Sequence, residues 1–132
     1  IKVFNYGKMH RDFTFIDDIV EGVIRCCYKP ASIDLTFDPL SPNPSTSAAP
    51  YRIFNIGNSN PVPLNYFIDL LEENFGKKAI KKFEPIQPGD VVATAAKMDL
   101  LFSWVGYKPT TSIEDGVYYF CKWYLEYFED NY

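Results

Sequence analysis

The chain has 132 residues, of which 47% are hydrophobic, 17% are aromatic and 23% are charged, and its net charge is −4. This composition excludes a disordered chain and predicts one folded domain over residues 1–132. The basic residues are scattered, which argues against a nucleic-acid partner, and no apolar run reaches the ~20 residues of a membrane span.

Three cysteines, Cys26, Cys27 and Cys121, are an odd number without the spacing of metal ligands. With no secretory signal, they predict reduced thiols in a cytoplasmic protein. The chain begins at Ile1, inside an apolar strand pattern and without an initiator Met. We therefore expect a piece of a longer protein.

The first 30 residues predict two strands and a helix. Residues 1–4 and 13–16 are rich in β-branched and aromatic residues, and Asn5-Tyr6-Gly7 predicts a turn after the first of them. The helix is expected from Ile19 to Lys29, with Asp18 as its N-cap, Glu21 completing a capping box and Pro30 ending it.

Residues 31–50 are rich in Pro and Ser and predict a long loop, either a functional contact or a plain excursion. Residues 51–56 predict a strand followed by a turn at 57–60. A helix is expected from Pro63 to a C-terminal cap at Gly76.

The last third predicts three further elements and a turn. Residues 80–85 read as a short strand, 87–90 as a turn, and 95–105 as a short helix ending at Gly106. Thr111 and Glu114 form a capping-box pattern before an apolar stripe that runs to the C-terminus. Strands alternating with helices predict an α/β fold.

Several kinds of chemistry are missing from the sequence. No two glycines lie within two positions of each other, so no G-x-G-x-x-G or Walker loop is present. The single histidine, His10, excludes a His-rich zinc site, and an exposed position is expected for it. Tyr118 and Lys122 spell Tyr-x-x-x-Lys, but they lie on the predicted C-terminal helix, where a structural role is favoured.

Arg11 is one of only three arginines, against ten lysines. Its planar fork matches phosphate or carboxylate bidentately, so it is either an anion site or the partner of a nearby aspartate, Asp12, Asp17 or Asp18. Asp90 follows Gly89 in the predicted turn. It is suited either to a pair of sugar hydroxyls or to the turn alone.

Residues 1–22, 44–59, 87–91 and 105–109 resemble, in this order, the extended short-chain dehydrogenase/reductases (the NAD-dependent epimerase/dehydratase family) that act on nucleotide sugars. Within that family they resemble the UDP-glucuronate 4-epimerases most. The resemblance implies the C-terminal, substrate-binding part of an extended Rossmann-type enzyme, with short strands and three to four amphipathic helices. It also implies that NAD and the catalytic tyrosine belong to an N-terminal Rossmann part that precedes Ile1. No catalytic, cofactor-binding or metal-binding residue is therefore expected in this chain.

The same resemblance implies roles for five residues in binding the UDP-sugar. Arg11 matches the family arginine that contacts the diphosphate, and Asp90 matches the aspartate at the ribose hydroxyls. Val3 and Phe4 fall where the family lines the uracil pocket. Gln87 stands where many relatives have a second phosphate-binding arginine, a departure that fits the glucuronate subgroup.

The resemblance thus implies a part of an enzyme that interconverts UDP-glucuronate and UDP-galacturonate at C4 through a 4-keto intermediate. The chain alone is expected to be inactive, with a role in polysaccharide biosynthesis for the whole enzyme. The alternatives are a UDP-sugar decarboxylase or dehydratase of the same family and a non-catalytic nucleotide-sugar binding or interaction module. Unpaired strand edges also predict a homo-oligomer.

Overall fold

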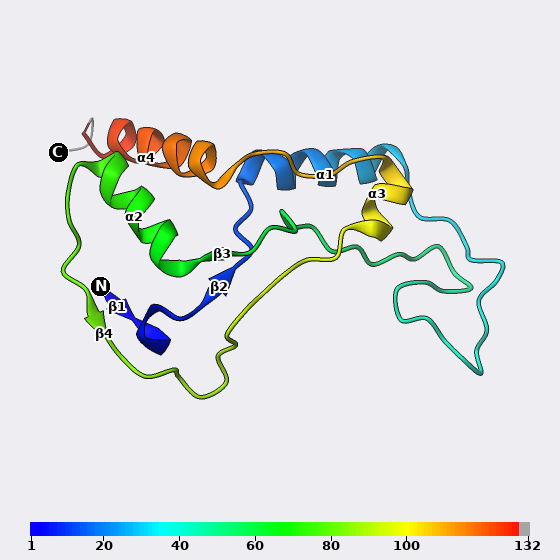
Figure 1. Cartoon of the computed structure of the whole chain (residues 1–132). Coiled ribbons are helices and arrows are strands. Elements are labelled where there is room, and N and C mark those ends of the chain that lie inside the picture. The colour runs from blue at the N-terminus through cyan, green and yellow to red at the C-terminus, as the bar shows by residue number, and fades with distance from the viewer. Residues whose placement is uncertain (130–132) are drawn as a thin grey trace.

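A computed structural model describes residues 1–129, and within them the chain forms four α-helices, one 3₁₀-helix and four very short strands (Figure 1). The predicted α/β class is confirmed. In chain order the elements are β1 (Lys2–Val3), η1 (Phe4–Gly7), β2 (His10–Arg11), α1 (Ile16–Tyr28), β3 (Val62–Pro63), α2 (Leu64–Phe75), β4 (Lys82–Phe83), α3 (Asp99–Val105) and α4 (Ile113–Glu129).

The strands form two separate pairs that join distant parts of the chain. β1 runs parallel to β4, with Val3 opposite Phe83, and β2 runs antiparallel to β3, with Arg11 opposite Val62. The chain turns between β1 and β2 through left-handed backbone at Asn5, Tyr6 and Gly7, as the predicted turn requires. Gly7 has a second reason to be glycine, because a Cβ there would lie 2.6 Å from Asn65 Oδ1.

Helix α2 packs against α4, and the core lies between them (Figure 1). Its buried members are Leu70, Val117 and Cys121, and partly buried side chains surround them: Phe67, Leu71, Phe75 and Ile113. These residues recur at helical spacing on each helix, so one apolar face of α2 meets one apolar face of α4.

The C-terminal end of α1 is fastened to α3 by a reciprocal contact. Lys29 Nζ donates to the Trp104 carbonyl at 2.6 Å, and Trp104 Nε1 donates back to the Lys29 carbonyl at 3.0 Å. The Lys29 ammonium also lies 4.6 Å from the centre of the Trp104 ring. The contact links residues 75 apart in the sequence and holds α3 beside the C-terminal end of α1 (Figure 1).

Several predicted strands are wrong in position or absent. Residues 13–15 are irregular, and Ile16 already belongs to α1. The Phe13 ring stacks on Phe67 at 4.1 Å and Phe15 packs against Tyr119, so these aromatic side chains serve helix packing rather than a strand ladder. Phe4 opens η1 instead of ending β1, whereas residues 82–83 form β4 within the predicted strand 80–85.

Residues 51–56 do not form the predicted strand. Among the described residues, this segment forms one antiparallel bridge, between Arg52 and Thr46, and the remainder of it has no regular structure. The loop 31–50 is present and is built from short turns in which a side chain caps the backbone two residues later. Asp34, Asp38 and Asn43 each accept such a hydrogen bond.

The helix ends differ from the prediction at their N-termini and agree at the C-termini of α1, α2 and α3. The predicted run of the last helix to the C-terminus includes residues 130–132, which lie outside the described residues. α1 begins at Ile16 with Phe15 as N-cap, so Asp18 does not cap it. Ser112, not Thr111, caps α4, because its hydroxyl accepts from the Asp115 amide at 3.0 Å. The short predicted helix begins at Asp99 rather than Ala95, and Pro63 precedes α2 rather than lying in its first turn.

Gly76 and Gly106 end α2 and α3 in the left-handed conformation, as predicted. This conformation carries little cost for a residue that has no Cβ. Among residues 1–129, no helix has both the length and the apolar character needed to cross a membrane. The three cysteines are free thiols.

Candidate functional site

The candidate site lies where residues 87–96 run beside β2. The His10 amide donates to the Val92 carbonyl at 2.9 Å, and the Thr94 amide donates back to the His10 carbonyl at 3.2 Å. These bonds form a parallel bridge between His10 and Ala93. The pairing brings the turn that contains Asp90 to the side chain of Arg11.

Arg11 and Asp90, 79 residues apart in the sequence, form an ion pair. Arg11 Nη2 donates to Asp90 Oδ1 at 2.9 Å, and Arg11 Nη1 donates to the carbonyls of His10 at 3.0 Å and Val92 at 3.3 Å. The two side chains are 23% and 31% exposed, so solvent still reaches them. The alternative in which Arg11 pairs with Asp12, Asp17 or Asp18 is therefore wrong, because Asp90 is the carboxylate in contact with it.

Gln87 and Asp90 are the two ends of one turn. The Asp90 amide donates to the Gln87 carbonyl at 3.1 Å, and Gly89 has a φ of 84°. Asp90 Oδ1 also accepts from the Val91 amide at 2.8 Å, which fixes the carboxylate toward Arg11. The turn thus presents Gln87 on the same connection that carries Asp90.

Val3 lies on β1 and Phe4 directly follows it, next to this connection. Val3 is 1% exposed, and its carbonyl accepts from the Glu84 amide at 3.0 Å, three residues before Gln87. Phe4 is half-buried at the start of η1. A role for either residue in holding uracil stays a prediction.

The sequence suggested Asp12 only as a possible partner of Arg11, and its actual partners were missed. Asp12 Oδ2 accepts from the amides of Ala96 at 2.9 Å and Ser59 at 3.0 Å, and Oδ1 accepts from the Asn60 amide at 3.3 Å. Adjacent side chains on extended backbone point to opposite sides, which separates Asp12 from Asp90. The turn signal at 57–60 was visible in the sequence, but its partner was not.

Asp18 is a second carboxylate whose role the sequence did not reveal. It is 7% exposed and accepts from the Tyr107 hydroxyl at 2.8 Å and from the amides of Thr111 at 3.1 Å and Thr110 at 3.3 Å. Burial raises the pKa of Asp18, but the hydrogen bonds from Thr111, Tyr107 and Thr110 outweigh burial and hold that pKa below its ordinary value. Burial and Asp18 together raise the pKa of Tyr107 to about 12. Neither group is poised for proton transfer near neutral pH.

Sequence comparison finds relatives that align with almost the whole chain. It is 47% identical over 129 residues to Protein CapI of Staphylococcus aureus, covering 98% of this chain and 39% of CapI. It is 42% identical over 129 residues to UDP-glucuronate 4-epimerase 1 of Arabidopsis thaliana, covering 96% of this chain and 29% of that protein. No protein-family model matches the chain.

The fold is also similar to that of a solved enzyme of the same kind. The UDP-glucuronic acid 4-epimerase of Bacillus cereus, solved with UDP-glucuronic acid and NAD, matches with a TM-score of 0.68 and 26% identity, over 93% of this chain and 35% of that one. The chain is a relative of the UDP-glucuronate 4-epimerases. It corresponds to their C-terminal part and spans less than two-fifths of the length of the relatives it matches.

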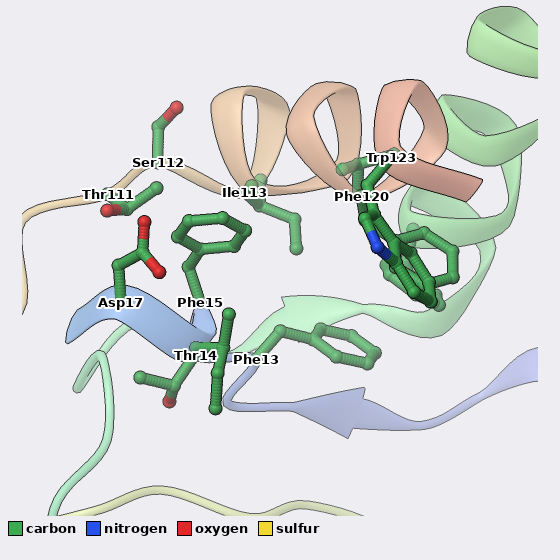
Figure 2. Close-up of a pocket in the computed structure, with 13 residues that line it drawn as sticks. Phe13, Thr14, Phe15, Asp17, Thr111, Ser112, Ile113, Phe120 and Trp123 are labelled. Atoms are coloured by element: carbon green, nitrogen blue, oxygen red, sulfur yellow. The ribbon is translucent and has the colours of Figure 1, made fainter. Parts of the chain in front are cut away.

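The chain also carries an apolar groove of about 650 Å³ between the start of α1 and α4. Figure 2 shows Phe120 and Trp123 extending from α4 toward Phe13, with Phe15 and Ile113 nearby. Asp17 is the one charged residue in its lining. The groove is too apolar to hold a diphosphate, and neither Arg11 nor Asp90 lines it.

The remaining candidates have ordinary surroundings. Tyr118 is 52% exposed on α4, and Lys122 lies 3.9 Å from Glu126, one turn further along the same helix. His10 is exposed on β2. Within residues 1–129, no cluster of three His, Cys, Asp or Glu side chains could hold a metal ion.

Proposed function

We propose that this chain anchors the UDP of a UDP-sugar in an NAD-dependent 4-epimerase that interconverts UDP-glucuronate and UDP-galacturonate. The observation that carries the proposal is the similarity to named UDP-glucuronate 4-epimerases over almost the whole chain. The substrate-binding unit would comprise residues 1–132. NAD and the groups that remove the C4 proton would belong to a part of the enzyme outside this chain.

Arg11 supplies the positive charge for the diphosphate in this proposal. Its guanidinium is held by Asp90 through Nη2 and by two backbone carbonyls through Nη1. A fixed planar fork loses little conformational entropy when it binds an oxyanion. The guanidinium is therefore organised for an anion before one arrives.

Asp90 faces the ribose in this proposal. Within residues 1–129 both hydrogen bonds that its carboxylate accepts use Oδ1, one from Arg11 and one from the Val91 amide. Oδ2 is then the oxygen suited to accept hydrogen bonds from the ribose hydroxyls. Arg11 and Asp90 together would fix the nucleotide at two points, while the sugar stays able to turn between the two hydride transfers.

Calorimetric titration of the protein with UDP tests the anchoring role. We expect Arg11→Ala to weaken binding at least about tenfold, because a charge-assisted contact with the diphosphate is lost. Arg11→Lys keeps the charge without the fork and should fall between wild type and Arg11→Ala. Arg25→Ala is the matched control, since Arg25 forms an exposed ion pair with Glu21 at 2.6 Å on α1.

Equal affinity of Arg11→Ala and wild type for UDP would contradict the proposal. Uridine, which lacks phosphate, should bind both proteins equally. A loss for uridine as large as the loss for UDP would place Arg11 elsewhere than at the diphosphate.

Product analysis tests the reaction. The whole enzyme is expected to convert UDP-glucuronate to UDP-galacturonate without releasing carbon dioxide, whereas carbon dioxide release would identify a decarboxylase. The 132-residue chain with added NAD is expected to give no product. Turnover by the chain alone would contradict the placement of the reacting groups outside it.

A further inference from the structure

Asp12 joins three segments of the chain with one carboxylate. Its two oxygens accept from the amides of Ala96, Ser59 and Asn60 at 2.9–3.3 Å, and its own amide donates to Thr94 Oγ1 at 3.2 Å. Hydrogen bonds to a charged acceptor are stronger than those between neutral groups. Asp12 is thus the point where residues 57–60 and 94–96 are tied to the end of β2.

The tie continues the backbone pairing that brings Asp90 to Arg11. Bonds between His10, Val92 and Thr94 hold residues 92–94 along β2, and the Asp12 contacts extend that attachment to Ala96. Without the Asp12 carboxylate, the segment that carries Asp90 would be held to β2 by the two backbone bonds, by the bond from the Asp12 amide to Thr94 Oγ1 and by Arg11 itself.

The joint is also closely packed. A Cβ at Gly57 would lie 2.4 Å from the Ala96 Cβ and 2.9 Å from Asp12 Oδ2, closer than atoms in proteins approach. Ser59 Oγ further donates to the Ala96 carbonyl at 2.8 Å. A Cβ at position 57 would therefore push Ala96 away from Asp12 without changing any charge.

We propose that Asp12 is a positioning residue for nucleotide binding, which fixes residues 94–96 on β2 and so holds Asp90 against Arg11. The inference rests on the proposed function, because it gives Arg11 and Asp90 the nucleotide as their ligand. Asp12 acts through them and does not touch the nucleotide.

Asp18 is a matched control. It too is a carboxylate that accepts three hydrogen bonds, but it ties α1 to residues 107–111, and none of these three bonds comes from the segment that carries Asp90. A general loss of stability should therefore affect Asp12→Asn and Asp18→Asn alike. A loss of positioning should affect only Asp12→Asn.

Two measurements on the same variants test the proposal. Amide hydrogen exchange by NMR should show that Asp12→Asn lowers the protection of the His10 and Thr94 amides relative to amides in α4, while Asp18→Asn leaves that ratio unchanged. Titration with UDP should show about tenfold weaker binding for Asp12→Asn and wild-type affinity for Asp18→Asn. In an Arg11→Ala background, Asp12→Asn should add much less than tenfold, because its route to the nucleotide is already lost.

Two changes that leave the Asp12 carboxylate in place keep the test decisive if Asp12→Asn folds poorly. Thr94→Val removes the hydroxyl that accepts from the Asp12 amide while keeping the shape of the side chain, and Gly57→Ala displaces Ala96. Both should weaken UDP binding in proportion to the protection lost at His10 and Thr94.

The outcomes separate this inference from the proposed function. If wild type binds UDP and Asp12→Asn binds it equally well, or if the losses from Asp12→Asn and Arg11→Ala simply add, the inference is overturned and the anchoring role stands. If wild type does not bind UDP, the anchoring role fails and the inference falls with it.

Discussion

Three aspartates within seven positions, Asp12, Asp17 and Asp18, have three different surroundings. Asp12 collects backbone amides from two other segments, Asp17 is exposed in the first turn of α1, and Asp18 is buried against residues 107–111. Their identity as carboxylates says little about these roles. What each one does depends on which distant segment reaches it.

Asp18→Asn is expected to destabilise the fold. The asparagine keeps one acceptor and turns an NH₂ group toward donors, so the free energy of unfolding should fall by about 1.5–3 kcal/mol, the range for hydrogen bonds to a charged group. Urea denaturation followed by circular dichroism measures it. Asp17→Asn is the control and should cost no more than about 1 kcal/mol, the scale of a charge at a helix N-terminus. Equal losses for the two variants would contradict this account of Asp18.

At the scale of an element, Glu72 in the last turn of α2 binds the residues that follow the helix. Its side chain is 4% exposed and lies 2.7 Å from Lys78 Nζ and 2.9 Å from Lys81 Nζ, and it accepts from the Ala79 amide at 3.1 Å. Together with the left-handed cap at Gly76, these contacts turn the chain from α2 into β4. β4 then pairs with β1 and leads toward Gln87.

The stability that Glu72 contributes should depend on pH. Hydrogen bonds from Lys78 and Lys81 lower the pKa of Glu72 from 4.5 to about 2. Because the folded pKa is the lower one, the contribution is fully present above pH 4.5 and is lost as pH falls from 4.5 toward about 2. Thermal melts of wild type and Glu72→Gln should therefore differ at neutral pH and converge in acid. A gap between the melting temperatures that stays constant over this range would contradict the assignment.

At the scale of the whole molecule, the sequence predicts those features that depend only on residues close together in the chain. The apolar stripes of α2 and α4 and the glycine caps at Gly76 and Gly106 are local patterns, and the structure has them. Residues 51–56 show the limit. A strand-like sequence forms a strand only when another strand pairs with it, and within residues 1–129 only Thr46 forms a bridge with this segment.

For the candidate site too, the sequence pointed to single residues but not to the contacts between distant segments. The rarity of arginine and the turn at Gly89-Asp90 drew attention to Arg11 and Asp90 separately. Their ion pair could not be read from the sequence, because it depends on how residues 92–94 align with β2 across a separation of about eighty residues. The roles of Asp12 and Asp18 were missed for the same reason, since every hydrogen-bond partner of their carboxylates is distant in the sequence.

Two helices leave apolar side chains in solvent. Ile16, Val20, Val23 and Ile24 on α1 are 43–61% exposed, and on α4 Phe120 is 44% exposed and Trp123 52% exposed. Exposed apolar surface of this kind marks a contact region. The high aromatic content noted in the sequence is therefore only partly used by the core between α2 and α4.

This surface predicts that the isolated chain self-associates, which its unpaired strand edges also predict. Sedimentation velocity at rising protein concentration should show an increasing average mass, because burying apolar side chains between copies offsets the loss of independent motion. Trp123→Lys should reduce the association, since it puts a charge on the exposed face of α4. Leu40→Lys is the control, because Leu40 is 94% exposed but lies in the loop 31–50, away from both helices. A mass that stays monomeric at every concentration would contradict the prediction, and an equal reduction by both variants would show that added charge, not the α4 face, controls association.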